Sequence, residues 1–389
     1  MKYRLDKRNN KELSILGMGC MRFPKNFAES EELVCQAVEM GINYFDTAYL
    51  YPGNEELLGK IVAKNQLRDK MYIATKLPLM IIKNDKDFDK FFLKELERLQ
   101  TNYIDYYLMH MITSYAQWEA LCKLGIEKWI QDKKKNGSIR QIGFSFHGEK
   151  SEFFKILDSY DWEFCQLQYN YSDENYQAGI QGVKQVAKRG IPLIIMEPLL
   201  GGKLVQGLPT EAVNVLNKAD SGKSPAEWAL RWLWNQPEVS VVLSGMNAMS
   251  QLEENVKAAQ NMEVGAFSNT EKAAIEEVRN IFRQSNKIPC TGCGYCLPCP
   301  KNVNIPACFS AYNATFALDK KTGVQQYMLS TGPLAEQESR ASLCVGCHKC
   351  EHHCPQNIKI AEELKTVKQK MEPWWYQIGF KILRLILRK

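Results

Sequence analysis

The sequence predicts an α/β protein in which a (β/α)8 TIM barrel is followed by a small, mainly α-helical domain. Over the first 260 or so residues, short runs of β-branched and aromatic residues alternate with amphipathic stretches of helical period. These apolar runs number eight, as a closed barrel of βα units requires. Nine of the 13 cysteines lie after position 289, which indicates a second domain.

The eight apolar runs are expected to form the parallel strands of the barrel. In chain order they read LSILGMG, INYFDTA, KMYIATKLP, IDYYLMH, RQIGFSFH, EFCQLQYN, IPLIIMEP and VSVVLSGM. A doubly wound open sheet is the alternative. The closed barrel is favoured because eight strands over about 245 residues match its usual size.

Helices are expected between these strands. Residues 30–41 should form one, with Ser30 as its cap and Gly41 as its stop. The others are expected over residues 87–100, 126–137, 224–236 and 266–285.

The expected domains are the barrel over 1–280, a cysteine-rich domain over 281–365 and a basic amphipathic helix over 366–389. Within the last segment, residues 373–389 combine tryptophans, an apolar face and basic side chains. Such a helix can lie on an anionic membrane, or it can cover the cysteine-rich domain or a partner.

Composition excludes few classes of protein. With 45% hydrophobic and 24% charged residues, the chain resembles an ordinary globular protein. A net charge of +6 without a long basic run in the first 365 residues argues against nucleic acid as a partner. The N-terminus lacks the apolar core of a secretion signal, and no stretch is as long as a membrane span. A cytoplasmic protein is therefore expected, in which closely spaced cysteines indicate metal and not disulfides.

Polar residues end five of the apolar runs, although a charge at the end of a buried strand is costly unless it is paired. In a (β/α)8 barrel the chemistry lies at these carboxyl ends. The residues are Asp46, Lys76, His110, Ser145 with His147, and Gln166.

Tyr51 follows Asp46 in the loop after its strand. An ammonium near a tyrosine favours the phenolate, so a Lys76 held by Asp46 would lower the pKa of Tyr51. Tyr51 could then donate a proton to a carbonyl oxygen, while His110 hydrogen-bonds the same oxygen. The alternative is that Asp46 and Lys76 form only a stabilising ion pair.

The segments FDTAYLY, ATKLP and LMH resemble the catalytic segments of the aldo-keto reductase family. The resemblance extends from LGMGCMRFP to SGMNAMSQLEEN and implies hydride transfer between a nicotinamide cofactor and a carbonyl or alcohol substrate. It also implies that the catalytic residues are Asp46, Tyr51, Lys76 and His110.

The same resemblance implies a binding site for NADPH or NADH. It assigns Ser145 and Gln166 to the nicotinamide amide, and Met196 stands where the family often has a stacking aromatic residue. The adenosine side is assigned to Ser244, Gly245, Gln251, Glu254 and Asn255. Because no arginine or lysine lies between Gly245 and Gln251, the choice between NADP and NAD stays open.

The cysteines after position 289 form two blocks. Cys344, Cys347, Cys350 and Cys354 have the C-x2-C-x2-C-x3-C-P spacing with which bacterial ferredoxins bind 4Fe-4S clusters. In that pattern the fourth cysteine of each block binds the other cluster. The expected sets are Cys290, Cys293, Cys296 and Cys354 for one cluster, and Cys344, Cys347, Cys350 and Cys299 for the other.

The first block departs from this pattern because only two residues separate Cys296 from Cys299, where the pattern has three. Cys308 is a candidate to replace it, and two structural zinc sites are the alternative to clusters. The interval between the blocks resembles the α-helical dicluster ferredoxin modules. The whole chain thus resembles aldo-keto reductases with a C-terminal ferredoxin-type 4Fe-4S domain.

The expected function is an oxidoreductase of a small carbonyl or alcohol substrate, with electron transfer through two 4Fe-4S clusters. A hydride carries two electrons and a cluster moves one, so coupling needs a flavin or a redox partner protein, and the sequence shows no flavin motif. The alternative is a carbonyl reductase, or a nucleotide-binding redox sensor, in which the clusters are structural or sensory. The sequence specifies neither the substrate nor the oligomeric state.

Overall fold

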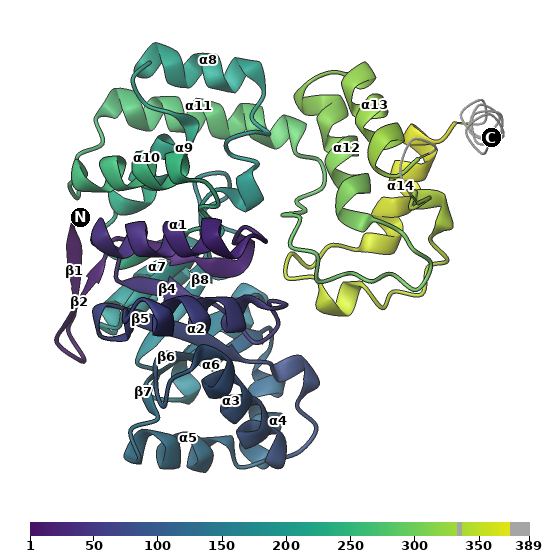
Figure 1. Ribbon diagram of the computed structural model, residues 1–389. Helices are drawn as coiled ribbons and strands as arrows, with labels where there is room; N and C mark the ends of the chain where they lie inside the picture. The colour runs from purple at the N-terminus through teal and green to yellow at the C-terminus, as the bar shows by residue number, and fades with distance from the viewer. Residues whose placement is uncertain (333–336, 374–389) are drawn as a thin grey trace. The chain divides into compact units, whose positions relative to one another are not determined.

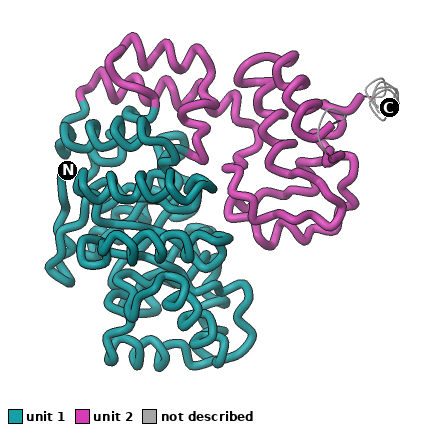
Figure 2. Tube along the Cα trace, in the orientation of Figure 1, with its two compact units in different colours: residues 1–199, 226–267 teal, residues 200–225, 268–389 magenta. Residues whose placement is uncertain are grey.

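The computed structural model describes residues 1–332 and 337–373 of the chain (Figure 1). The chain forms two compact units, residues 1–199 with 226–267 and residues 200–225 with 268–389 (Figure 2). The expected boundaries at positions 280 and 365 remain predictions, and position 366 falls inside α14 (Ile360–Met371). Most of the tail for which membrane contact was considered, residues 374–389, lies outside the described residues.

The first unit contains a closed barrel of eight parallel strands, which confirms the predicted fold and excludes the open sheet. β10 closes it by pairing with both β9 and β3. The strands are β3 (Leu16–Gly19), β4 (Tyr44–Asp46), β5 (Tyr72–Leu77), β6 (Ile104–Ile112), β7 (Ile139–Phe146), β8 (Phe164–Gln168), β9 (Leu193–Met196) and β10 (Val241–Ser244).

The strands are almost continuously apolar because helices cover the outside of the barrel and side chains fill its inside. All nine residues of β6 are buried. Inside the barrel, Tyr44 and Tyr106 pack with their ring centroids 5.1 Å apart, and Tyr106 meets Phe164 at the same separation. The barrel is therefore a packed core and not a channel.

An N-terminal hairpin that the sequence reasoning missed covers the amino ends of the strands. β1 (Tyr3–Asp6) pairs antiparallel with β2 (Lys11–Ser14), and Leu13 enters the barrel core. The Tyr106 hydroxyl donates to Asp6 Oδ2 over 3.0 Å and thereby ties the hairpin to β6.

Helices follow the strands of the first unit. They are α1 (Phe27–Glu39), α2 (Asn54–Lys64), α3 (Lys86–Leu99), α4 (Tyr115–Lys123), α5 (Ile126–Lys135), α6 (Lys150–Ser159), α7 (Gly179–Lys188), α9 (Pro225–Trp234) and α10 (Met249–Gln260). Ser30 was wrongly expected to cap α1: the cap is Asn26, whose side chain accepts from the amides of Ala28 and Glu29. Ser30 lies inside the helix and donates to Pro24 O, while Gly41 ends the turn at φ 91° as expected.

The second unit is helical in its described part. α8 (Thr210–Ala219) packs against α11 (Asn269–Ser285), and α12 (Ile305–Ala317) packs against α13 (Lys320–Ser330) and α14. Phe309, Tyr327, Leu364 and Val367 form part of a buried core, and six of the cysteines pack against it.

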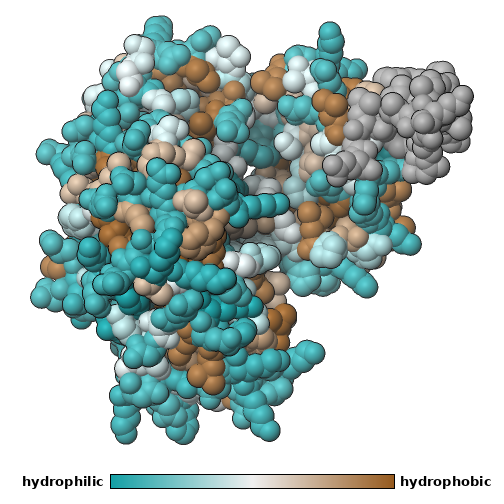
Figure 3. Space-filling view, viewed as in Figure 1, coloured by the Kyte–Doolittle hydropathy of each residue, from teal (hydrophilic) through white to brown (hydrophobic). Residues whose placement is uncertain are grey.

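Hydrophilic side chains predominate on the face of the molecule shown in Figure 3, with small apolar patches interspersed. Among residues 1–332 and 337–373, the structure contains no helix that is both long and apolar enough to cross a membrane.

Candidate functional site

A buried ion pair between Lys76 and Asp46 lies at the carboxyl ends of β4 and β5. Lys76 Nζ donates to Asp46 Oδ1 and Oδ2 over 2.8 and 2.7 Å and to the carbonyl oxygen of Thr47 over 2.7 Å. Lys76 is 1% exposed and Asp46 is 4% exposed. Because removal of either partner would leave an uncompensated buried charge, the two residues depend on each other.

Tyr51 and His110, the other two residues expected at this site, lie beside this pair. Lys76 Nζ is 5.3 Å from the centroid of the Tyr51 ring, and the Tyr51 and His110 ring centroids are 6.2 Å apart at 86°. Burial, followed by the charges of Lys76 and His147, holds the pKa of His110 well below its usual range. His110 is therefore a neutral imidazole at physiological pH.

Gln166 contacts the ion pair directly, which the sequence reasoning did not predict. Burial raises the pKa of Asp46, while Lys76 and a hydrogen bond from the Gln166 side chain counteract this effect. Gln166 is 2% exposed, and its Oε1 has no hydrogen-bond partner within the described ranges. One end of this amide is therefore fixed by Asp46, and its buried acceptor is available to a ligand.

Ser145 and His147 lie at the end of β7. Ser145 Oγ accepts a hydrogen bond from the amide of Met111 over 2.9 Å, which helps to hold Met111 at its positive φ of 57° next to His110. His147 Nδ1 lies 3.3 Å from Gln177 Nε2. Ser145 thus positions the segment that carries His110, in addition to the cofactor contact expected of it.

The five residues expected on the adenosine side extend from Ser244, the last residue of β10, to Asn255 within α10. Asn255 Nδ2 donates to Ser244 Oγ over 3.1 Å, and Gln251 Oε1 accepts from the Asn247 amide over 3.0 Å. Gly245 and Glu254 are exposed. The segment from 244 to 255 is thus folded on itself, so three of the expected contact residues, Ser244, Gln251 and Asn255, also shape the loop.

Arg22 is a candidate cofactor residue that sequence reasoning missed. It ends the short helical turn Cys20–Arg22 after β3, and it is exposed. A Cβ atom added at Gly245 would lie 3.8 Å from Arg22 Cδ. No arginine or lysine lies between Gly245 and Gln251 in the sequence, but barrel closure places the turn after the neighbouring strand β3, with Arg22, next to Gly245.

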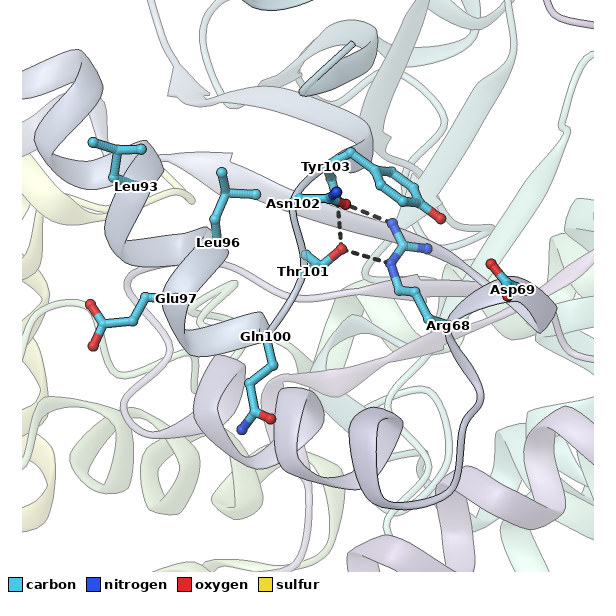
Figure 4. Close-up of a pocket in the computed structure, with 9 residues that line it drawn as sticks. All are labelled: Arg68, Asp69, Leu93, Leu96, Glu97, Gln100, Thr101, Asn102 and Tyr103. Atoms are coloured by element: carbon cyan, nitrogen blue, oxygen red, sulfur yellow. Dashed lines mark hydrogen bonds between the residues drawn. The ribbon is translucent and has the colours of Figure 1, made fainter. Parts of the chain in front are cut away.

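A surface depression at the opposite end of the barrel is not part of this site. Its lining residues come from the segments that precede β5 and β6 (Figure 4). Arg68 donates to Thr101 Oγ1 over 3.0 Å and to Asp105 Oδ2 over 2.7 Å, and it stacks on the Tyr103 ring. These polar groups stabilise the amino face of the barrel, where the fold does not place catalysis.

The first predicted set of cysteines surrounds one cavity in the second unit. The cavity is lined by Cys290, Cys293, Cys296 and Cys354, together with apolar side chains such as Ile305 and Phe309. Burial raises the pKa of Cys296 to about 12, and Cys293, Cys290 and Cys354 contribute to the shift. Four thiols around one apolar cavity fit the ligand set of a 4Fe-4S cluster.

Three cysteines of the second set, Cys299, Cys344 and Cys350, also lie near one another. Burial raises the pKa of Cys350 to about 11, and Cys344 and Cys299 are among the neighbours that contribute. Cys347 of this set is exposed. Across the part of the chain that the structure describes, no three His, Cys, Asp or Glu side chains converge tightly enough for a single metal ion.

Cys308, the candidate substitute for Cys299, has a different environment. It lies on α12, is 0% exposed, and its Sγ lies 3.8 Å from the carbonyl oxygen of Ser339. Tyr327 is its hydrogen-bonding neighbour. Cys308 therefore behaves as a small core residue, and Cys299 is the better fourth thiol for the second set.

Comparison with known proteins matches two parts of the chain to two families. Residues 15–280 match the aldo/keto reductase family, and residues 289–359 match the 4Fe-4S dicluster domain. The chain is 27% identical over 283 residues to an uncharacterized oxidoreductase of Bacillus subtilis, covering 64% of this chain and 88% of that one. It is 28% identical over 278 residues to L-galactose dehydrogenase of Arabidopsis thaliana, covering 64% and 84%.

Solved structures share the fold. An aldo-keto reductase from Bacillus halodurans in its holo form aligns with a TM-score of 0.60 and 23% identity, covering 72% of this chain and 96% of that one. An aldo/keto reductase from Klebsiella pneumoniae in complex with NADP and acetate aligns with a TM-score of 0.58 and 20% identity, covering 72% and 96%. The chain is therefore a member of the aldo/keto reductase family, and it carries a 4Fe-4S dicluster domain C-terminal to its barrel.

Proposed function

We propose that the protein is a nicotinamide-dependent oxidoreductase that interconverts a small carbonyl compound and its alcohol, with Tyr51 as the acid/base. The observation that carries this proposal is the buried Lys76–Asp46 pair beside the Tyr51 ring. NADPH or NADH, when bound, supplies or accepts the hydride.

Each of the four residues has a separate role. The Lys76 ammonium favours the phenolate of Tyr51, which eases the release of the Tyr51 proton to the substrate oxygen. Asp46 pairs with the Lys76 ammonium group in a buried position. His110 is neutral, so it can donate a hydrogen bond to the same oxygen without carrying a charge into the site.

The cofactor would be held by residues from four strand ends. Gln166 Oε1 is a buried acceptor for the amide N–H group of the nicotinamide, and Ser145 lies at the end of the adjacent strand β7. Ser244, Gly245, Gln251, Glu254 and Asn255 remain the proposed adenosine-side residues. Arg22, beside Gly245, is a proposed partner for a cofactor phosphate, which guanidinium groups bind well.

The Tyr51→Phe variant tests the catalytic proposal. We expect its kcat for NADPH- or NADH-dependent carbonyl reduction to fall by at least about 100-fold, the usual contribution of a general acid. The Kd of the nucleotide should stay unchanged. Tyr49→Phe is the matched control, because Tyr49 lies in the same loop with its ring against Phe91. An unchanged kcat in Tyr51→Phe would contradict the proposal.

We further propose that the two sets of cysteines hold two 4Fe-4S clusters, one with Cys290, Cys293, Cys296 and Cys354 and one with Cys299, Cys344, Cys347 and Cys350. Each cluster, when bound, exchanges one electron at a time. The exposed Cys347 makes the second site the one that a redox partner protein would approach. Reduced thiols require a reducing compartment, for which we propose the cytoplasm.

One anaerobic preparation distinguishes coupled clusters from structural or sensory ones. If the clusters exchange electrons with the barrel, NADPH or NADH with an added flavin as the two-electron to one-electron mediator should bleach their visible absorption, and a carbonyl substrate should restore it. In Cys344→Ser, carbonyl reduction driven by a one-electron donor such as methyl viologen, with the same flavin present, should be lost. Packing of the cysteines against the helical core instead favours a structural role. Absence of bleaching by the nucleotide, together with an unchanged rate of carbonyl reduction in Cys344→Ser, would support that alternative.

A further inference from the structure

Two side chains that are not themselves cluster ligands lie next to the first set of cysteines, Cys290, Cys293, Cys296 and Cys354. Thr291 lies between two of these ligands and lines their cavity. It is 3% exposed, and its hydroxyl has no hydrogen-bond partner among residues 1–332 and 337–373. A buried hydroxyl without a partner is costly, so this group is expected to meet a ligand in the cavity.

The second side chain is Lys203, from the segment that follows β9. Its Nζ lies 3.5 Å from Asn286 Oδ1 and interacts electrostatically with Cys290. The segment is pressed closely against the cysteine loop, because a Cβ atom at Gly201 would overlap the carbonyl oxygen of Thr291. Gly201 also has a φ of 68°, so both the space and the backbone favour glycine there.

We propose that the Thr291 hydroxyl and the Lys203 ammonium act on the first 4Fe-4S cluster and raise its reduction potential. The inference rests on the proposed binding of two clusters. Thr291 would donate a hydrogen bond to a cluster sulfur, and Lys203 would supply a positive charge near the Cys290 thiolate. Both stabilise the reduced form, which carries one more negative charge than the oxidised form.

Burial acts in the opposite direction. The first cavity is lined by Ile305, Phe309, Ile358 and Ile360, and a low-dielectric environment disfavours the more highly charged, reduced cluster. The second set is nearer to solvent, because Cys347 is exposed. Thr291 and Lys203 would therefore offset the free-energy cost that burial imposes on the reduced form of the first cluster. They would have no such effect on the second cluster.

The test is an anaerobic redox titration of the full-length protein with its clusters, followed by visible absorption and electron paramagnetic resonance. Thr291→Val removes the hydroxyl, and Lys203→Gln removes the charge but keeps a donor for Asn286. We expect each variant to shift the reduction equilibrium of one cluster roughly tenfold towards its oxidised form. This shift lowers the midpoint potential of that cluster by about 59 mV for a one-electron couple. Thr291→Ser and Lys203→Arg should restore the wild-type potential.

Two controls separate this effect from others. Lys218→Gln removes an exposed lysine of α8 and should move neither potential. Iron and sulfide content should equal that of the wild type in every variant. Wild-type potentials in both Thr291→Val and Lys203→Gln, or equal shifts of both clusters, would overturn the inference while leaving the two clusters assigned. Wild-type protein without a 4Fe-4S spectrum would instead overturn the proposed cluster binding itself.

Discussion

Glu95 is a buried acid on the outer side of the barrel that takes no part in the proposed reaction. It is 0% exposed, and the Tyr107 hydroxyl donates to its Oε2 over 2.6 Å. Burial, followed by the nearby carboxylate of Glu55, raises the pKa of Glu95 well above its usual range. Glu95 is therefore protonated in the folded protein at pH values where it is ionised in the unfolded chain.

This residue predicts a pH dependence of stability. Above the ordinary glutamate pKa of about 4.3, the folded state holds a proton that the unfolded state releases, so stability falls as the pH rises towards the raised pKa. Glu95→Gln keeps an acceptor for Tyr107 and removes the titration. We expect it to raise the free energy of unfolding at pH 8 by on the order of 1 kcal/mol, measured by urea denaturation.

The gain should shrink as the pH falls through the ordinary glutamate pKa of about 4.3, below which Glu95 is protonated in both states. Glu97→Gln is the control, because Glu97 is exposed on the same helix and pairs with Lys94. A gain of equal size in both variants, or one independent of pH, would exclude Glu95 as its source.

His110 predicts a feature of the pH–rate profile. An ordinary histidine titrates near pH 6.5, but burial and the charge of Lys76 keep His110 neutral. We expect log kcat/KM for carbonyl reduction to show no His110-dependent inflection between about pH 5.5 and about pH 7.5. An acid limb near pH 6.5 that disappears in His110→Gln would show that this histidine titrates during turnover.

At the scale of elements, α12 fixes the start of the first cysteine block. Asn313 on this helix accepts from the Ile288 amide over 3.0 Å and donates to the Ile288 carbonyl over 2.7 Å. Its Nδ2 also donates to Asn286 Oδ1 over 2.9 Å. The Cys290 amide in turn donates to Ile288 O over 2.8 Å, so one side chain orders the backbone that leads to the first ligand.

Asn313→Leu has a similar volume but leaves the Ile288 amide without its partner, while the Ile288 carbonyl keeps only the Cys290 amide. Each buried backbone group left unpaired costs about 1–3 kcal/mol. We expect a lower urea midpoint and a loss of iron from the first site, measured by metal analysis and electron paramagnetic resonance. Asn217→Leu, at an exposed position of α8, should retain full iron content. Full loading of Asn313→Leu would show that α12 does not position this loop.

Element boundaries illustrate the limit of sequence patterns. The apolar runs predicted all eight strands because alternation with amphipathic stretches is a local property of the chain. The cap of α1 was assigned to Ser30 because serine is a common cap, whereas Asn26, one turn earlier, makes the cap contacts. Both residues suit that role in sequence, and only the path of the chain distinguishes them.

At the scale of the whole molecule, each site joins residues that are far apart in the sequence. Cys354 reaches the loop of Cys290, Cys293 and Cys296, while Cys299 of the first block joins Cys344 and Cys350 of the second. This exchange predicts the effect of single cysteine variants. Cys354→Ala should lose the first cluster and Cys299→Ala the second, each leaving about four iron atoms per chain.

Cys308→Ala is the matched control and should keep both clusters, because Cys308 is a fully buried core residue on α12. Spectra of the remaining cluster in Cys354→Ala and Cys299→Ala should differ from each other. Loss of a cluster in Cys308→Ala, with both retained in Cys299→Ala, would reassign the second set.

The eight strands, the polar residues at their ends and the cysteine spacing can all be predicted from the chain alone, because each is a pattern within a few residues. Folding brings Gln166 to Asp46, Arg22 to Gly245 and Lys203 to Cys290, and none of these pairs is visible in the sequence. These pairs form when the barrel closes or the helices of the second unit pack. Local periodicity carries no information about which distant segments then meet.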